Sequence, residues 1–200
     1  MSLFVESLNR MEVTKLDCNF ETSTCGFIQA KNDDFDWTRR KGGTSSSGTG
    51  PSSDHTSGSG YYMYIETSRR SGNLARMSTP PLSFSGDRCI TFFYHMYGTT
   101  IGRLEVMVNG RIVFSASGNK GNSWLEAGIN LNLQGNYPIT FTGVRGSSYT
   151  GDIAIDDFSL RAGTCVSGTQ KFLFYINRES RQFPTEQYKK PTLISRRWIG

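Results

Sequence analysis

Few side chains in this sequence are arranged for catalysis. The only histidines are His55 and His95, and neither lies in a G-x-S-x-G nucleophile elbow or an H-E-x-x-H zinc helix. Asp54 directly precedes His55 and serines are abundant, but a catalytic triad is a spatial arrangement that this order of residues does not indicate. We expect His95, which aromatic residues flank, to be a hydrogen-bonded residue of the core. The chain is therefore expected not to be an enzyme.

Acidic residues offer a second kind of chemistry. In the run Gly151–Phe158, Asp156 and Asp157 are adjacent, and side chains alternate between the two faces of a strand. At least one of these carboxylates must therefore lie beside apolar neighbours, where it needs hydrogen bonds, a cationic partner or a bound metal. The acidic run Asp33–Asp36 lacks the glycine and the glutamate of an EF-hand loop. We expect that run to be a polar turn before a strand anchored by Trp37.

Four cysteines, Cys18, Cys25, Cys89 and Cys165, form the third group. The first two are too far apart for a redox C-x-x-C pair, and the histidines do not follow zinc-finger spacing. A disulfide framework in a β-rich chain is typical of proteins outside the cell. Four cysteines allow three pairings, and the spacing alone does not select one.

These residues must be positioned by strands. Hydrophobic alternation and turn residues outline about ten short strands and indicate an all-β protein. The clearest strand is 90–96, which is largely apolar on both faces, as in a sandwich. Residues 103–114 predict a hairpin, because the central pair Asn109-Gly110 favours a type I′ turn.

Two further strands are expected at 137–144 and 152–160. The Ser/Gly-rich stretch 41–60 matches neither G-x-G-x-x-G nor G-x-x-x-x-G-K-[ST]. We expect it to be an ordered surface connection with flexible portions, and not a nucleotide site.

The positive charge lies in one segment. Residues 166–200 contain seven Lys and Arg against two Glu, which accounts for the whole formal charge of +5, so the preceding residues are neutral overall. No nucleic-acid partner is therefore expected. We interpret 166–200 as a basic tail that is disordered or outside the domain, and a contact of this tail with polyanions is the alternative.

A set of motifs, in this order, resembles the MAM domain. They are Leu16–Glu21, Cys25–Phe27, Asp34–Trp37, Gly48–Pro51, Asp54–Thr56, Tyr61–Glu66, Tyr94–Gly98 and Gly151–Asp157, closed by Cys165. The resemblance covers residues 16–165, with 1–15 as an N-terminal extension. It implies an antiparallel β-sandwich of jelly-roll type, an extracellular place and no catalysis by the module itself.

The resemblance also implies the disulfides Cys18–Cys25 and Cys89–Cys165. Some MAM domains carry a calcium or sodium ion, and the resemblance implies Glu21, Asp54 and Asp156 as its ligands, which suits the preference of hard cations for oxygen. The alternative is a salt bridge to arginine or a network of backbone amides around the carboxylates. No cofactor for chemistry is expected.

The function expected from the resemblance is protein binding or adhesion outside the cell, with copies of the same chain or another extracellular protein as partner. The alternative is an accessory domain of a larger secreted enzyme such as a metalloprotease. The sequence does not identify the binding face. No export signal is visible in the first fifteen residues and no segment is apolar enough to span a membrane, so we expect a fragment of a longer extracellular protein that meets a membrane only through its parent.

Overall fold

The computed structural model describes residues 15–68, 73–165 and 173–176, and within them it contains twelve β-strands and no helix. The described residues thus include no helix that could cross a membrane. The strands are β1 (Lys15–Cys18), β2 (Ile28–Gln29), β3 (Thr38–Lys41), β4 (Tyr61–Ile65), β5 (Leu74–Ser78), β6 (Leu82–Met96), β7 (Arg103–Val108), β8 (Arg111–Ser117), β9 (Leu125–Tyr137), β10 (Ile139–Val144), β11 (Ile153–Ala162) and β12 (Leu173–Ile176).

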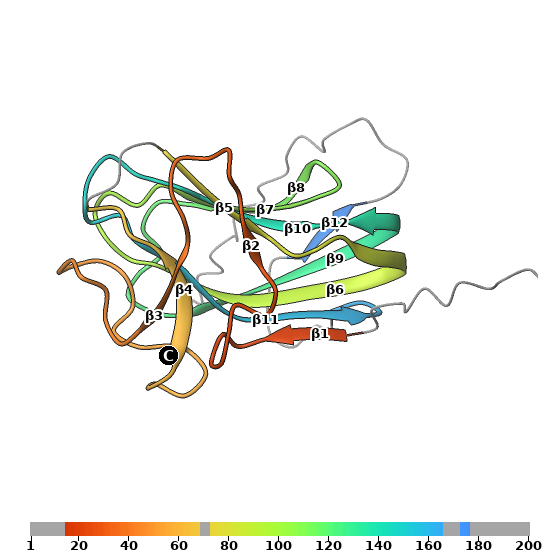
Figure 1. Cartoon of the computed structure of the whole chain (residues 1–200), viewed down its shortest axis with the longest axis horizontal. Helices are drawn as coiled ribbons and strands as arrows, with labels where there is room; N and C mark the ends of the chain where they lie inside the picture. The colour runs from red at the N-terminus through yellow and green to blue at the C-terminus, as the bar shows by residue number, and fades with distance from the viewer. Residues whose placement is uncertain (1–14, 69–72, 166–172, 177–200) are drawn as a thin grey trace, which may run out of the picture.

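The strands form two sheets that pack face to face (Figure 1). The large sheet has the order β12-β9-β6-β11-β4-β3, and β1 also pairs with β11; the small sheet has the order β2-β5-β10-β7-β8. Every pair is antiparallel except β12 with β9. The predicted all-β sandwich is confirmed.

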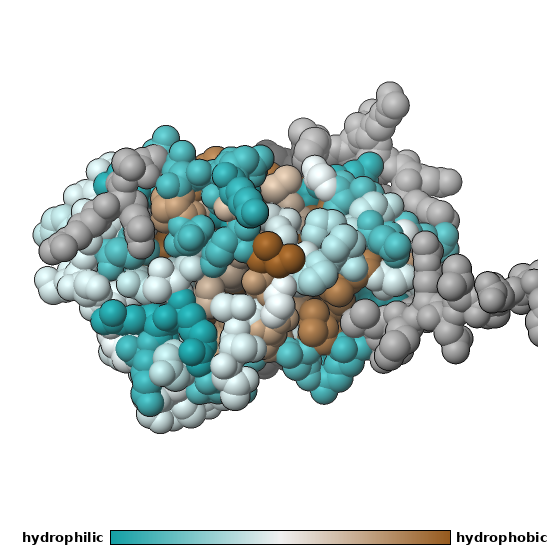
Figure 2. Space-filling view, in the orientation of Figure 1, coloured by the Kyte–Doolittle hydropathy of each residue, from teal (hydrophilic) through white to brown (hydrophobic). Residues whose placement is uncertain are grey.

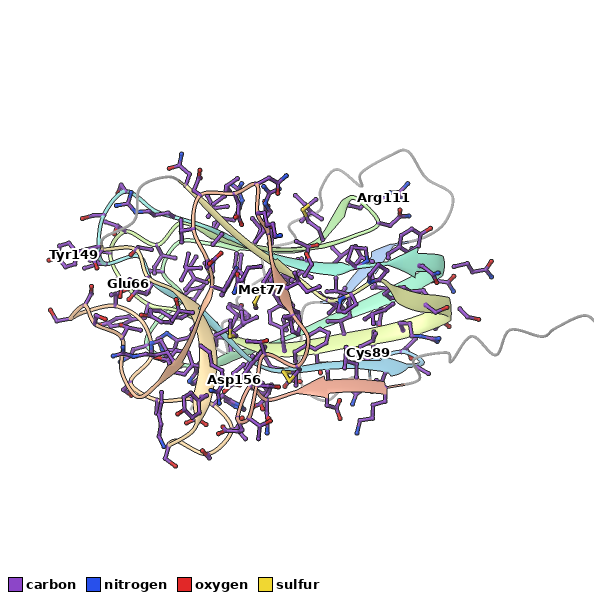
Figure 3. The ribbon with its side chains drawn as sticks, viewed as in Figure 1. Glu66, Met77, Cys89, Arg111, Tyr149 and Asp156 are labelled. Carbon is purple, nitrogen blue, oxygen red and sulfur yellow. A yellow bond between two sulfur atoms is a disulfide. The ribbon has the colours of Figure 1, made fainter. Side chains whose placement is uncertain are left out.

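Aromatic side chains from both sheets meet in the core. Phe92 on β6 lies with its ring centroid 5.1 Å from that of Phe141 on β10, nearly perpendicular to it, and Phe158 on β11 contacts the same ring at 5.9 Å. Edge-to-face pairs of this kind add to the free energy gained from burial. Met77 of β5 points between the sheets and is fully buried (Figure 3).

The local sequence signals agree with the strands. β7 and β8 form the expected hairpin, and Asn109 and Gly110 at its turn have φ of 52° and 68°, as a type I′ turn requires. The strand expected at 90–96 is the second half of β6, which begins at Leu82 because it pairs along its length with the long strand β9. Trp37 is buried next to the acidic turn, as predicted.

The Ser/Gly-rich stretch lies between β3 and β4, and we call its residues 42–60 the cover loop. The hydroxyl of Thr49 donates to the carbonyl of Tyr97 at 2.9 Å and accepts from the amide of Asp152 at 2.9 Å. Near its start, the Tyr62 hydroxyl donates to the Gly42 carbonyl at 2.6 Å. These bonds reach β4 and the residues directly before β11 and directly after β6, so the loop is held against the large sheet.

Both disulfides implied by the resemblance are present. Cys18–Cys25 joins the end of β1 to the turn before β2, and Cys89–Cys165 joins β6 to the segment after β11. No cysteine is free.

One segment near the C-terminal end adds to the large sheet. Within residues 166–200, which were expected to be a tail that is disordered or outside the domain, Leu173–Ile176 form β12, which pairs in parallel with Gly128–Leu131 of β9. The run is aromatic and aliphatic, a composition that favours strands, and it adds to the edge of the large sheet. At the other end, Lys15 already pairs with Arg161. Residues 1–14, 166–172 and 177–200 lie outside the described residues.

Candidate functional site at the β11 bulge

β11 changes its neighbour halfway along its length. Ile153–Ile155 pair with β4, whereas Phe158–Arg161 pair with β1 on the same side. Between the two, the register with β6 shifts and Asp157 takes a φ of 47°, which marks a β-bulge. The bulge interrupts the alternation that the sequence analysis assumed, and it lets Asp156 and Asp157 both reach the cover loop.

Asp156 is the fully buried carboxylate of this bulge. Its Oδ2 accepts the amide of His55 at 2.8 Å and its Oδ1 accepts the amide of Asp157 at 2.8 Å. Burial raises the pKa of Asp156 to about 7, and the nearby Asp157 carboxylate adds to the rise, while the amide donors oppose it. Of the two alternatives to a metal, the amide network is the one found here.

Asp157 binds the cover loop through side chains. Its Oδ2 lies 2.6 Å from Nδ1 of His55, and its Oδ1 accepts the hydroxyl of Thr56 at 2.7 Å. The side chains of His55 and Asp157 are 32% and 24% exposed, so the pair is partly shielded from solvent. An Asp-His pair supplies two members of a triad, but among the described residues the His55 ring hydrogen-bonds to Asp157 alone.

Aromatic rings complete the contact between the cover loop and the large sheet. The His55 ring stacks on Phe93 of β6, with centroids 3.5 Å apart and planes 16° apart. Trp124 donates its indole N–H to the Ser53 carbonyl at 3.1 Å. Its ring also contacts His95 edge-on, with centroids 5.4 Å apart. Phe93 and Trp124 could not be identified from the sequence, because only the fold brings them to the loop.

His95 is the buried histidine that the sequence predicted as a core residue. It is 2% exposed, and its Nε2 lies 3.1 Å from Oδ1 of Asn122. Burial lowers its pKa, and the bond to Asn122 opposes that change. This prediction is confirmed.

Asp54 holds the turn inside the cover loop. Its Oδ2 accepts the amide and hydroxyl of Ser57 at 2.7 and 3.1 Å, and its Oδ1 accepts the amide of Gly60 at 2.6 Å. Burial acts to raise the pKa of Asp54, but these donors outweigh it and lower the pKa. Its role in the described structure is to order the backbone of residues 54–60.

Glu21 reaches the same turn from the other side. Its Oε1 accepts the amide of Tyr61 at 3.3 Å, and its carboxylate occupies the space where a Cβ on Gly60 would lie. Arg39 fixes this segment by donating to the carbonyl of Glu21 at 2.5 Å while its guanidinium stacks 3.6 Å from the centroid of the Tyr61 ring. Glycine at position 60 thus lets Glu21 approach the loop.

All three predicted metal ligands therefore contact the segment 55–61, from β11, from the cover loop and from the turn after β1. Their oxygens are of the type that suits calcium. As they lie, however, no three Asp, Glu, His or Cys side chains of the described residues form a group that could hold an ion. Backbone amides take the positions at Asp54 and Asp156. Calcium or sodium at this place stays a prediction.

A further buried carboxylate, Asp152, was not identified from the sequence. Its Oδ1 accepts the amide and the hydroxyl of Thr67, each at 3.0 Å, and the residue is fully buried. Burial raises its pKa, and the nearby Glu66 carboxylate adds to this. Asp152 lies directly before β11, two positions before Ala154 and four before Asp156, so the alternation already applied to Asp156 could have found it.

Comparison with known proteins places this arrangement in a family. The family model described as MAM domain, meprin/A5/mu, matches residues 18–166. The chain is 43% identical over 179 residues to a chicken MAM domain-containing glycosylphosphatidylinositol anchor protein 1, covering 81% of this chain and 19% of the relative. It is 43% identical over 157 residues to human MAM domain-containing protein 2, covering 74% of this chain and 23% of the relative. The chain thus spans about a fifth of the length of these relatives.

Solved structures share the fold at low sequence identity. The K1 cleaved adhesin domain of the Lys-gingipain of Porphyromonas gingivalis W83 superposes with a TM-score of 0.53 at 15% identity, covering 75% of this chain and 99% of that domain. The K3 adhesin domain of the same protein gives 0.52 at 14% identity, with coverage of 72% and 95%. This likeness concerns the fold. Because the family model covers more than half of the residues, the chain belongs to the MAM domain family.

Proposed function

We propose that this MAM domain is a non-catalytic extracellular module that binds other proteins, either further copies of itself or a different partner. The observation that carries the proposal is that Glu21, Asp54, Asp156 and Asp157 accept hydrogen bonds that hold the cover loop against a disulfide-linked sandwich. These contacts support a rigid scaffold, and we propose that binding takes place on its surface, where exposed anchors contribute most of the affinity.

Relatives support an extracellular place. Several of them are named glycosylphosphatidylinositol anchor proteins. We therefore propose that the parent protein, and not this domain, contacts the membrane. Two disulfides also fit an oxidising compartment. The alternative, an accessory domain of a larger secreted enzyme, keeps the same binding role and differs only in the domains that the parent carries.

The test uses beads coated with the oxidised domain. We expect them to adhere to one another or to intact cells, and we expect adhesion to cells to be lost after protease treatment of the cell surface. Beads coated with the reduced and alkylated domain are the matched control, because that form has the same composition without the scaffold. Adhesion no greater than that of the control, in both assays, would overturn the proposed function.

A further inference from the structure

On the outer face of the small sheet, one row of side chains across the strands has an exposed isoleucine at each end. The register places Ile28, Ser78, Thr140, Met107 and Ile112 side by side across its five strands. Ile28 and Ile112 are 59% and 51% exposed, and with Tyr149 they are the exposed large hydrophobic residues of the described chain. Figure 2 shows an apolar patch at the position of β2, set among hydrophilic residues. The two ends of one row are thus available for contact.

The next row carries opposite charges on either side of β10, the central strand. The register sets Thr142 between Arg76 of β5 and Glu105 of β7. Thr142 is 4% exposed, and among the described residues neither its hydroxyl nor Nε of Arg76 has a hydrogen-bond partner. Nη2 of Arg76 donates to the Asn32 carbonyl at 2.8 Å, and Glu105 accepts from Arg103 at 2.6 Å. A cation and an anion therefore lie on either side of the central strand, and the side chain of the anion is 13% exposed.

We propose that a second copy of this chain docks face to face on the small sheet, with a two-fold axis running along β10. This axis lays β5 of one copy over β7 of the other, so that each Arg76 meets the partner's Glu105 and two ion pairs form. It also brings Ile28 over the partner's Ile112 at both edges. The inference rests on the proposed function and names its partner and its surface.

The charges select this axis. A two-fold axis across the strands at Thr142 would set Arg76 on the partner's Arg76 and Glu105 on the partner's Glu105, and repulsion between like charges disfavours that pairing. Packed sheets are rotated relative to each other by about 30°, about an axis perpendicular to both. This rotation displaces the pairs near the centre of the face least. Arg76 and Glu105 lie on the strands adjacent to β10, so their pairing tolerates the rotation.

The size of the face sets the strength of the association. Five strands at a spacing of roughly 4.8 Å span about 20 Å, which places the contact at the low end of specific protein interfaces. We therefore expect a weak dimer that forms at high local concentration. Many copies on one surface would engage together and strengthen the contact.

Sedimentation velocity over rising concentration tests the dimer. Arg76→Glu alone, or Glu105→Arg alone, turns both ion pairs into like-charge contacts, and each is expected to raise the dissociation constant roughly tenfold or more. An equimolar mixture of the two variants restores opposite charges in both pairs. The mixture is expected to form a heterodimer at about the parental strength.

Lys120→Glu is the matched control, since Lys120 is exposed and lies outside the small sheet. It is expected to leave the association unchanged. Circular dichroism and melting curves establish that each variant is folded, and Ile112→Glu replaces any variant that is not, with loss of the dimer expected. A parent that stays monomeric, or single variants that associate as the parent does, overturns the proposed dimer. Coated beads that still adhere to cells would then leave the proposed function standing with another partner.

Discussion

Nδ1 of His55 lies 2.6 Å from Oδ2 of Asp157, although 102 positions separate the two residues in the sequence. The amide of the same histidine donates to Asp156, so one residue of the cover loop engages both carboxylates of the β11 bulge. The ring then stacks on Phe93. Backbone, side-chain and ring contacts converge at His55, so this one residue joins the loop to the large sheet in three ways.

Asp157→Asn is expected to loosen the cover loop. Asparagine keeps the size of the side chain and tolerates the positive φ of this position, but it removes the charge that faces His55. We expect the free energy of unfolding to fall by about 1 kcal/mol and proteolysis within residues 42–60 to become faster. Denaturant melts and timed digestion measure both effects. Asp36→Asn, at an exposed position, is the control, and equal behaviour of the two variants would contradict this role.

Gly60→Ala tests the approach of Glu21 to the loop. A Cβ at position 60 would overlap the Glu21 carboxylate, which must then move and give up its bond to Tyr61. We expect a loss of about 1 kcal/mol in unfolding free energy, and a smaller loss in a Glu21→Ala background, because the two residues are in contact. Gly43→Ala in the same loop is the matched control, because a Cβ at position 43 would make only ordinary van der Waals contacts, at 3.9 Å or more, with Ser52 and Pro51. Additive effects of Gly60→Ala and Glu21→Ala would refute the contact.

Local signals predicted much of the fold. The Asn109-Gly110 pair predicted its turn because the type I′ conformation depends on those two residues alone. The largely apolar run 90–96 predicted its strand because apolar side chains on both faces indicate a strand that is covered on both sides. The disulfide pairing came from the resemblance, since four cysteines by themselves allow three patterns.

The site was predicted less fully, for a physical reason. Burial of an acid within β11 followed from alternation, but the partners of Asp156 and Asp157 depend on a loop about a hundred residues earlier. The bulge depends on the exchange of β4 for β1 as neighbours of β11, which is a property of the assembled sheet. β12 depends in the same way on the free edge of β9.

The two disulfides are expected to contribute unequally. Cys89–Cys165 closes a segment with a sequence separation of 76 and Cys18–Cys25 one of 7. The chain-entropy model assigns them about 4.5 and about 2.4 kcal/mol respectively. Replacing each pair by alanine and measuring denaturant midpoints compares them under identical conditions. A larger loss for the Cys18–Cys25 pair would show that the entropy of the unfolded chain does not determine their relative contributions.

His95 is expected to make the stability depend on pH. Burial lowers its folded-state pKa below the ordinary value of 6.5, so the unfolded chain binds a proton more readily than the folded one. The stability is therefore full above about pH 6.5 and falls as the pH drops below it, by at most about 1.4 kcal/mol per pH unit. His95→Gln does not titrate, so the melting temperature of the parent should fall relative to this variant between about pH 7 and pH 5. Parallel curves would contradict the prediction.

The calcium or sodium ion implied by the resemblance is tested through the same melting curves. Glu21, Asp54 and Asp156 all contact residues 55–61, and a cation that binds them only in the folded protein would stabilise it by mass action. Millimolar calcium is then expected to raise the melting temperature, chelation to lower it, and Asp156→Asn to abolish the difference more strongly than Asp36→Asn.

A chelator does not remove sodium or a very tightly bound ion, so melting curves do not detect them. Elemental analysis of the purified domain is therefore needed to detect these ions. An unchanged melting curve together with no bound metal would contradict the ion. The amides of His55, Asp157, Ser57 and Gly60 and the hydroxyl of Ser57 would then satisfy Asp54 and Asp156 without a metal, and these acids would serve to hold the cover loop.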